Sequence, residues 1–245
     1  MKTNKSYIGI TFIILVFGIF AIPKIINRIS DDRITDENRL NKVKKGIKSI
    51  EKASGLVKFN KVPNFNFRNQ DSLSVDNSFF EDKVYVVEFF FTTCPTICPI
   101  MTQSMLEIED SFGDLDDFAI ASFTINPAYD TPSVLKEYMK SYGIKSENWQ
   151  MLTGSHNDVM SLANKGFNLY AAMENKAPGG FEHSGMFALV DKNGFIRSRK
   201  DEFGNPILCY RGITETSKDE LGEVIDTSIH QLTELKQDIL KLLKE

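Results

Sequence analysis

The feature that most constrains this chain is an apolar segment that leads directly into two cysteines. Residues 84–91 are apolar apart from Glu88 and rich in β-branched and aromatic side chains, which is typical of a buried strand. Cys94 and Cys98 follow, each directly before a proline, and residues 100–108 show the apolar spacing of a helix. The sequence therefore predicts that both thiols lie where a buried strand turns into a helix.

This junction favours sulfur chemistry, because a helix N-terminus stabilises an anionic thiolate. Two thiolates at this spacing can share a soft metal ion, or close a disulfide if the turn brings their Cα atoms near enough. A structural cysteine is expected inside the apolar segment instead. We therefore expect Cys94 and Cys98 to be functional, as metal ligands or as a redox pair.

The whole chain limits the remaining possibilities. Its 245 residues suffice for one core domain with extensions. The net charge of −4 and the lack of a clustered basic patch argue against a nucleic-acid partner. Three cysteines are too few for a disulfide scaffold.

The N-terminus predicts export from the cytoplasm. The apolar span from Ile8 to Ile26 follows a basic start and is broken only by Lys24, so it can cross a thin bilayer. A cleaved signal peptide looks similar, but no convincing small-x-small cleavage site follows, and we favour an uncleaved anchor. The flanking positive charges barely discriminate orientation. Either alternative places the rest of the chain in an oxidising compartment, outside the inner (cytoplasmic) membrane on its periplasmic or extracytoplasmic side.

The pattern predicts three parts. Residues 1–26 are a cytoplasmic start and single transmembrane anchor, residues 27–58 a polar tether, and residues 59–245 the folded domain. Within the domain we expect strands and helices in the following order: strands 62–67 (an edge strand), 73–75 and 84–91, a helix from about 100, strand 118–125, helix 132–142, strand 149–152, helix 157–164, a hairpin of 186–190 with 195–197, and a helix over 221–243. This alternation predicts an α/β sandwich of thioredoxin type, with a central mixed sheet flanked by helices.

A histidine is the expected third member of the site. His183 lies in a Gly/Pro-rich loop over 177–185, directly before a buried strand, and loops of this kind often present functional groups. In a thioredoxin-type sheet that strand lies next to strand 84–91. His156 is expected to be exposed or to cap a helix, and His230 to be a surface or packing residue of the last helix.

Two thiolates and one imidazole form a soft, open ligand set that suits Cu(I), and with an added oxygen ligand or water also Cu(II). Zinc is less suitable, because a structural zinc site needs four protein ligands and no clear fourth is present. Met101 and Met105 have helical spacing and are expected in the core, and Cys209 is expected to be a lone buried thiol.

Several segments in order resemble the SCO/SenC family, over about residues 63 to 199. They are residues 93–99, 122–132, 149–154 and 183–191, and the N-terminal anchor also fits the family. The resemblance implies a thioredoxin-like fold that holds copper through Cys94, Cys98 and His183. It further implies delivery of copper to, or thiol reduction in, the dinuclear copper centre of cytochrome c oxidase, so that the copper-receiving oxidase subunit is the expected partner.

The chain departs from the family pattern at Thr96 and Asn126, where the family usually has Asp. Loss of these carboxylates should weaken binding of a divalent cation more than of Cu(I), and should lower the thiol pKa values. Residues 199–211 also differ from the usual short ending before the last helix.

Two functional hypotheses remain. The favoured one is a membrane-tethered copper chaperone, in which Cys94 and Cys98 are ligands and His183 completes the site. The alternative is a thiol-disulfide oxidoreductase, in which one cysteine attacks a target disulfide and the other resolves it. Peroxide reduction is weaker, because no motif places an Arg beside the attacking thiolate.

Overall fold

The apolar segment before the cysteines forms the central strand of the sheet. In the computed structural model it is β4 (Val84–Phe90), and all seven of its residues are buried. It pairs in parallel with β5 (Phe118–Thr124), which pairs in parallel with β6 (Trp149–Thr153). On its other side lies β9 (Met186–Val190), antiparallel. The predicted neighbourhood of strands 84–91 and 186–190 is therefore confirmed.

The structure describes residues 55–174, 176–213, 217–218, 224–225 and 227–245. They belong to one compact unit that spans residues 51–245. The predicted anchor, and the tether up to residue 54, lie outside these ranges. Within them, no helix combines the length and apolarity that a bilayer crossing requires. Leu56 and Val57 are buried, so the folded part begins slightly before the expected residue 59.

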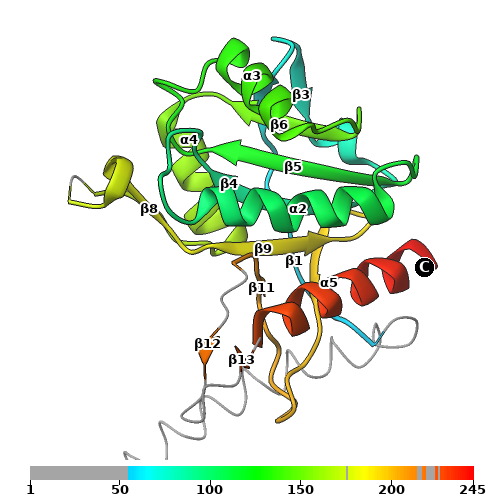
Figure 1. Cartoon of the computed structure of the whole chain (residues 1–245). Helices are drawn as coiled ribbons and strands as arrows, with labels where there is room; N and C mark the ends of the chain where they lie inside the picture. Colours follow the sequence, from blue (N-terminus) through cyan, green and yellow to red (C-terminus); the bar gives the residue numbers. More distant parts are fainter. Residues whose placement is uncertain (1–54, 175, 214–216, 219–223, 226) are drawn as a thin grey trace, which may run out of the picture. The chain divides into compact units, whose positions relative to one another are not determined.

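Among the described residues, nine strands form one mixed sheet, in the order β1-β10-β9-β4-β5-β6-β2-β3 with β11 paired to β9 (Figure 1). The remaining strands of the sheet are β1 (Val57–Lys61), β2 (Asn66–Asn69), β3 (Ser74–Asp76), β10 (Phe195–Ser198) and β11 (Tyr210–Arg211). Helices pack on this sheet, as the predicted α/β sandwich requires. They are α2 (Cys98–Phe112), α3 (Pro132–Tyr142), α4 (His156–Ser161) and α5 (Thr227–Leu243).

The alternation of side chains along β4 separates the helices into two layers. Phe90 faces α3, where its ring lies 5.6 Å from that of Tyr138, and Tyr138 is hydrogen-bonded to Thr102 of α2. Phe89 faces the opposite layer, where its ring lies 5.8 Å from Phe167 at the end of the π-helix η2 (Leu162–Phe167) that continues α4. The central strand is thus covered on both faces, which explains why its sequence is almost continuously apolar.

A small hairpin stands apart from the main sheet. Strands β7 (Ala171–Met173) and β8 (Phe181–His183) pair only with each other among the described residues, and the short 3-10 helix η3 (Pro178–Gly180) precedes β8. Figure 1 shows this hairpin projecting from the side at which β5 ends. A second two-stranded ribbon joins β12 (Ser217–Lys218) to β13 (Val224–Ile225), and η1 (Asn77–Phe80) follows β3.

Two secondary-structure predictions were wrong. The predicted edge strand 62–67 is the inner strand β2, which starts at Asn66 and lies between β6 and β3; β3 forms the edge. Residues 62–65, which precede β2, do not pair as a strand. The side chain of Asn77 holds them by accepting a hydrogen bond from the Phe65 N–H and donating one to the Pro63 carbonyl. The last helix begins at Thr227 rather than 221, because the β-branched pair Val224–Ile225 forms β13.

Other predictions are confirmed. Helix α3 starts at Pro132 and ends at Tyr142, and the next residue, Gly143, has a φ of 72°, the left-handed conformation expected of a C-terminal cap. The turn between β9 and β10 contains Gly194 at φ 78°. Asp191 stabilises this turn by accepting hydrogen bonds from the backbone N–H groups of Asn193 and Phe195.

Candidate metal centre

The loop that carries Cys94 is fixed at the carboxyl ends of β4 and β5. Asp130 is completely buried and accepts hydrogen bonds from the backbone N–H and the hydroxyl of Thr92, and from the hydroxyl of Thr124. These contacts tie the end of β4 to the end of β5, two residues before Cys94. The Cys94 N–H then donates to the Phe91 carbonyl at 3.2 Å, so the chain turns sharply toward α2.

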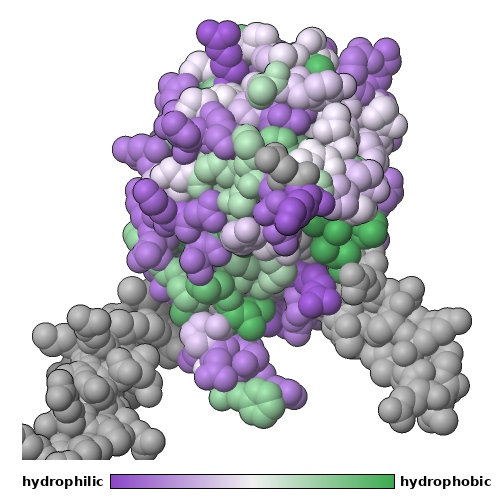
Figure 2. Space-filling view, turned by 90° about the vertical axis from the view of Figure 1, so that its left-hand side faces the viewer, coloured by the Kyte–Doolittle hydropathy of each residue, from purple (hydrophilic) through white to green (hydrophobic). Residues whose placement is uncertain are grey.

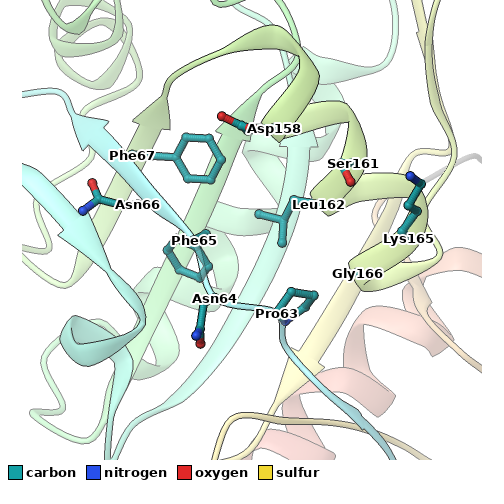
Figure 3. Close-up of a pocket in the computed structure, with 10 residues that line it drawn as sticks. All are labelled: Pro63, Asn64, Phe65, Asn66, Phe67, Asp158, Ser161, Leu162, Lys165 and Gly166. Atoms are coloured by element: carbon teal, nitrogen blue, oxygen red, sulfur yellow. The ribbon is translucent and has the colours of Figure 1, made fainter.

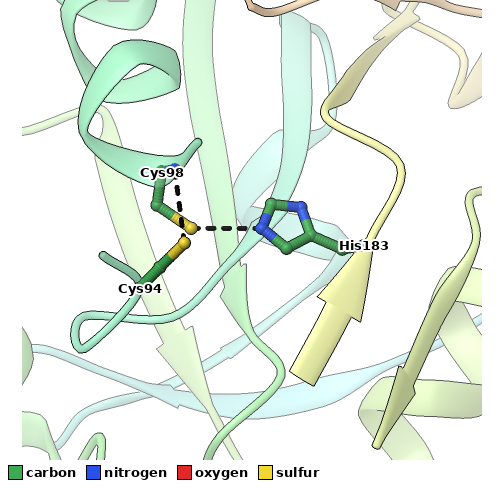
Figure 4. Close-up of side chains that lie close together, drawn as sticks. All are labelled: Cys94, Cys98 and His183. Carbon is green, nitrogen blue, oxygen red and sulfur yellow. Dashed lines mark hydrogen bonds between the residues drawn. The ribbon is translucent and has the colours of Figure 1, made fainter. Parts of the chain in front are cut away.

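Cys98 is the first residue of α2, with Pro99 in the first turn, where a missing N–H costs nothing. Its backbone N–H donates to Cys94 Sγ at 3.5 Å, and its own Sγ lies 3.1 Å from His183 Nε2 (Figure 4). His183 comes from β8, so the two chain segments meet across a separation of 85 residues. The Sγ atoms of both cysteines and a ring nitrogen of His183 all lie within 4.8 Å of one another.

All three side chains are buried, with exposed fractions of 7% for Cys94, 1% for Cys98 and 8% for His183. The hydrogen bond from the Cys98 thiol holds the pKa of Cys94 well below its usual range, and hydrogen bonds from His183 and nearby backbone N–H groups act in the same direction. Burial, together with the neighbouring Cys94, raises the pKa of Cys98. The pair therefore holds one thiolate at neutral pH, on Cys94.

The donor set fits a soft metal ion. Two sulfur atoms and one imidazole nitrogen lie within 4.8 Å of one another, and no carboxylate of the described residues joins the group. Thiolate and imidazole ligands favour Cu(I) over hard cations such as Mg²⁺ and Ca²⁺, which take oxygen ligands. The structure thus places the three residues singled out in the sequence at one point, in the loop after β4, at the start of α2 and at the end of β8.

The position of His183 differs in detail from the expectation, because it ends a strand instead of lying in a loop. The Gly/Pro-rich residues before it form η3, in which Gly179 has φ 80°. A Cβ atom at Gly179 would come within 2.6 Å of the Phe91 ring. The glycine therefore allows the turn of the hairpin to approach the strand that leads to the cysteines.

The other candidates lie outside the metal group. His156 begins α4, and Ser155 rather than His156 caps that helix through its side chain. His230 lies within α5, and its side chain is outside the described residues. Met101 and Met105 are fully buried, as expected of core residues. Cys209 is buried, and burial raises its pKa to about 12, which is consistent with a lone unreactive thiol.

The two departures from the family pattern have different surroundings. Thr96 Oγ1 lies 3.6 Å from Cys94 Sγ, so this position borders the site directly. Asn126 shapes the loop after β5: its N–H donates to the Thr124 hydroxyl, and its carbonyl accepts hydrogen bonds from the N–H groups of Tyr129 and Asp130.

Sequence reasoning missed the contributions of Asp130 and Glu88. Glu88 points toward the α2 side of β4 and is 2% exposed; Ser122 donates a hydrogen bond to its Oε1 atom at 2.7 Å. Burial raises its pKa to about 7, and its charge acts on the Cys98 thiol. The available signal was an acidic residue in the middle of an otherwise apolar strand.

Two pockets have different relations to this site. A pocket of about 390 Å³ opens directly onto Cys94 and His183. Another, of about 560 Å³, lies between the segment before β2 and the α4–η2 helix, with Phe65, Phe67 and Leu162 among its lining residues (Figure 3). The lining of this second pocket includes none of the three site residues.

Comparison with known proteins yields a consistent set of similarities. A family model described as SCO1/SenC matches residues 55–217. A SCO1 protein homolog of Bacillus subtilis is 31% identical over 162 residues, which cover 64% of this chain and 77% of that protein. A Stutzerimonas stutzeri protein, proposed to bind copper, is 28% identical over 142 residues, 56% of this chain and 67% of that protein.

Solved structures share the fold. A SCO1/SenC family lipoprotein of Bacillus anthracis has a TM-score of 0.60 and 25% identity, with 76% of this chain and 96% of that chain covered. BsSco, described as a member of the Sco family of cytochrome c oxidase assembly proteins in which a disulfide switch was identified, has a TM-score of 0.54 and 27% identity, covering 73% and 93%. The predicted thioredoxin-like fold with a central mixed sheet is confirmed.

Proposed function

The chain belongs to the SCO1/SenC family, and from this premise we propose that it is a copper-binding chaperone in the assembly of cytochrome c oxidase. The observation that carries the proposal is the convergence of the donor atoms of Cys94, Cys98 and His183 within 4.8 Å. This set suits Cu(I), and with an added oxygen ligand Cu(II). Copper binding is also proposed for the Stutzerimonas relative, and oxidase assembly is the role described for the family of BsSco.

Each residue has a distinct part in holding the cargo. Cys94 does not have to release a proton when the metal binds, because its low pKa favours the thiolate beforehand. Cys98 releases its proton on binding, so metal loading is linked to pH. His183 offers Nε2 at 3.1 Å from Cys98 Sγ and closes the site from the hairpin side. Burial of all three donors excludes water, while the pocket beside Cys94 leaves one side from which an acceptor's ligands can approach.

The proposed acceptor is the oxidase subunit that contains the dinuclear copper centre, reached by ligand exchange. In this account residues 1–26 anchor the chain in the cytoplasmic membrane, and residues 27–58 tether the domain on the extracytoplasmic side. Confinement to the membrane surface raises the effective concentration of chaperone near a membrane-bound client.

A second function, thiol-disulfide exchange, has a specific observation in its favour. Cys94 has the low pKa of an attacking thiol, and the more buried Cys98 lies beside it with the raised pKa of a resolving thiol. His183 separates the two functions, because a dithiol exchanger does not need a third ligand.

The test is replacement of His183 by Ala in the full-length protein. We expect at least about 100-fold weaker Cu(I) binding, more than the loss of an outer-shell partner costs, with disulfide exchange largely retained. His156→Ala is the matched control, because His156 lies outside the donor group. Unchanged Cu(I) affinity in His183→Ala, measured by competition with a chromogenic chelator, would refute the chaperone site as described.

A further inference from the structure

The pocket beside Cys94 is built by two chain segments that are far apart in sequence. One wall comes from the cysteine loop with Phe91, Thr96 and Ile97, and the other comes from the β7–β8 hairpin and its turn. Its volume of about 390 Å³ lies at the low end of the range for ligand pockets, which suits one or two side chains rather than a large cofactor.

The pocket gives access to one thiol in particular. Cys94 and His183 line it, whereas Cys98 does not. A sulfur atom that enters the pocket therefore meets Cys94 first. The pocket wall also includes the partly buried side chains of Phe181 and Ile97, so apolar surface lies in the same pocket as the Cys94 sulfur.

Acidic side chains border the same pocket. Glu174 and Glu182 are both exposed, and neither forms an ion pair with any described residue. Apart from His183, Lys176 is the one basic residue of the described lining, so the two glutamates outnumber the lysine by one. A cationic side chain placed there lowers the electrostatic energy of the complex, and an anionic one raises it.

The face of the molecule that carries the hairpin also combines apolar and hydrophilic surface. Figure 2 looks at the side of the molecule from which the hairpin projects in Figure 1, and shows hydrophobic surface in the middle of the domain with hydrophilic residues on both sides. Tyr170, directly before β7, and Met173, at the end of β7, are 52% and 60% exposed. Exposed apolar groups with a charged border are typical of a protein interaction site.

We propose that this pocket is the docking site for an extended segment of a client protein, in which a cysteine is flanked by an apolar residue and by Lys or Arg. The client's sulfur meets Cys94, the apolar side chain lies on Phe181 and Ile97, and the cation lies near Glu174 and Glu182. The inference rests on the proposed function, because it names the feature by which the copper or thiol acceptor is recognised.

Thiol exchange with short peptides tests this docking site without copper. The probes are three peptides whose cysteine carries a thionitrobenzoate group, with Leu beside the cysteine and Lys, Ala or Glu two residues away. The Cys94 thiolate attacks the peptide sulfur and forms a Cys94–peptide disulfide, while the bond to the aromatic sulfur breaks and a coloured thiolate leaves. Cys98 then attacks Cys94 Sγ, so that a Cys94–Cys98 disulfide remains and the peptide leaves as a thiol.

We expect rates in the order Lys, Ala, Glu, with a spread of about three- to tenfold at low ionic strength that disappears in high salt. The double substitution Glu174→Lys and Glu182→Lys should reverse the order, and Lys176→Ala should widen the spread. Glu137→Lys with Glu147→Lys is the matched control: both residues are exposed and lie outside the pocket lining, so the original order should remain.

A spread that stays unchanged in the Glu174 and Glu182 double variant would overturn the docking site, as would equal rates for all three peptides. A faster reaction with glutathione that carries the same thionitrobenzoate group than with every peptide would assign the pocket to a small thiol instead. Cu(I) affinity measured on the same variants separates the two claims. If the unsubstituted protein does not bind Cu(I), the chaperone proposal is contradicted. If it binds Cu(I) but reacts with the Lys, Ala and Glu peptides at equal rates, only the docking site is contradicted.

Discussion

Glu88 makes the stability of the domain depend on pH in a way that one substitution should remove. Its carboxyl is 2% exposed in the middle of β4, and among the described residues its Oε2 atom has no hydrogen-bond partner. Burial raises its pKa from 4.5 to about 7. A carboxyl with a raised pKa favours folding less as pH increases, because the unfolded chain ionises first. No loss occurs below pH 4.5, where both states are protonated, and the loss is complete above pH 7.

The size of this effect follows from the two pKa values. A rise of 2.5, from 4.5 to about 7, corresponds to about 3 kcal/mol at about 1.4 kcal/mol per tenfold change in equilibrium constant. Glu88→Gln has nearly the same shape, keeps an oxygen for the Ser122 hydrogen bond and does not ionise. The difference in unfolding free energy between the variant and the unsubstituted protein should therefore grow by about 2–3 kcal/mol in favour of the variant as the pH rises from 5 to 8.

The assay is chemical denaturation of the reduced protein at several pH values, with Glu147→Gln as an exposed control. Ionisation of Cys94 also affects stability, but it is present in both proteins and cancels to a first approximation. If the unsubstituted protein and Glu88→Gln lose or gain stability in parallel from pH 5 to pH 8, Glu88 is not held protonated by burial and the reasoning fails.

Two further predictions concern the cysteine loop and the hairpin. Because the pKa of Cys94 is low, iodoacetamide should label Cys94 of the reduced protein at pH 5 while Cys98 and Cys209 remain unlabelled; equal labelling of the thiols in peptide mass spectra would contradict this. Gly179→Ala should lower the unfolding free energy by about 1–3 kcal/mol, more than Gly204→Ala, because both glycines have positive φ but only a Cβ at Gly179 meets the Phe91 ring. Equal losses in the two variants would show that the contact with Phe91 has no cost.

The centre of the fold was predictable because its sequence signals are local. Residues 84–91 are almost continuously apolar, which indicates a strand that is covered on both faces. The two cysteines follow this strand directly. Pro132 and Gly143 mark the ends of α3 with residues whose backbone preferences leave little choice. The start of the last helix was not predictable, because Val224 and Ile225 fit both a helical apolar pattern and a short strand.

The site was predictable only in part. Cys94 and Cys98 are close in sequence, but contact with His183 bridges 85 residues and followed from the expected strand order and the family resemblance. The roles of Asp130 and Glu88 depend on which side chains face each other after folding. Thr92 and Thr124 become partners of Asp130 only because β4 and β5 are parallel and end at the same edge. No spacing rule along the chain contains that information.

The most direct test of the central claim is the copper content of the full-length protein after anaerobic reduction and Cu(I) loading. We predict one tightly held copper per chain, lost in Cys94→Ser, Cys98→Ser and His183→Ala, and retained in Cys209→Ser, because Cys209 lies outside the donor group. No retained copper in the unsubstituted protein, together with a readily reduced Cys94–Cys98 disulfide, would contradict the chaperone and support the oxidoreductase.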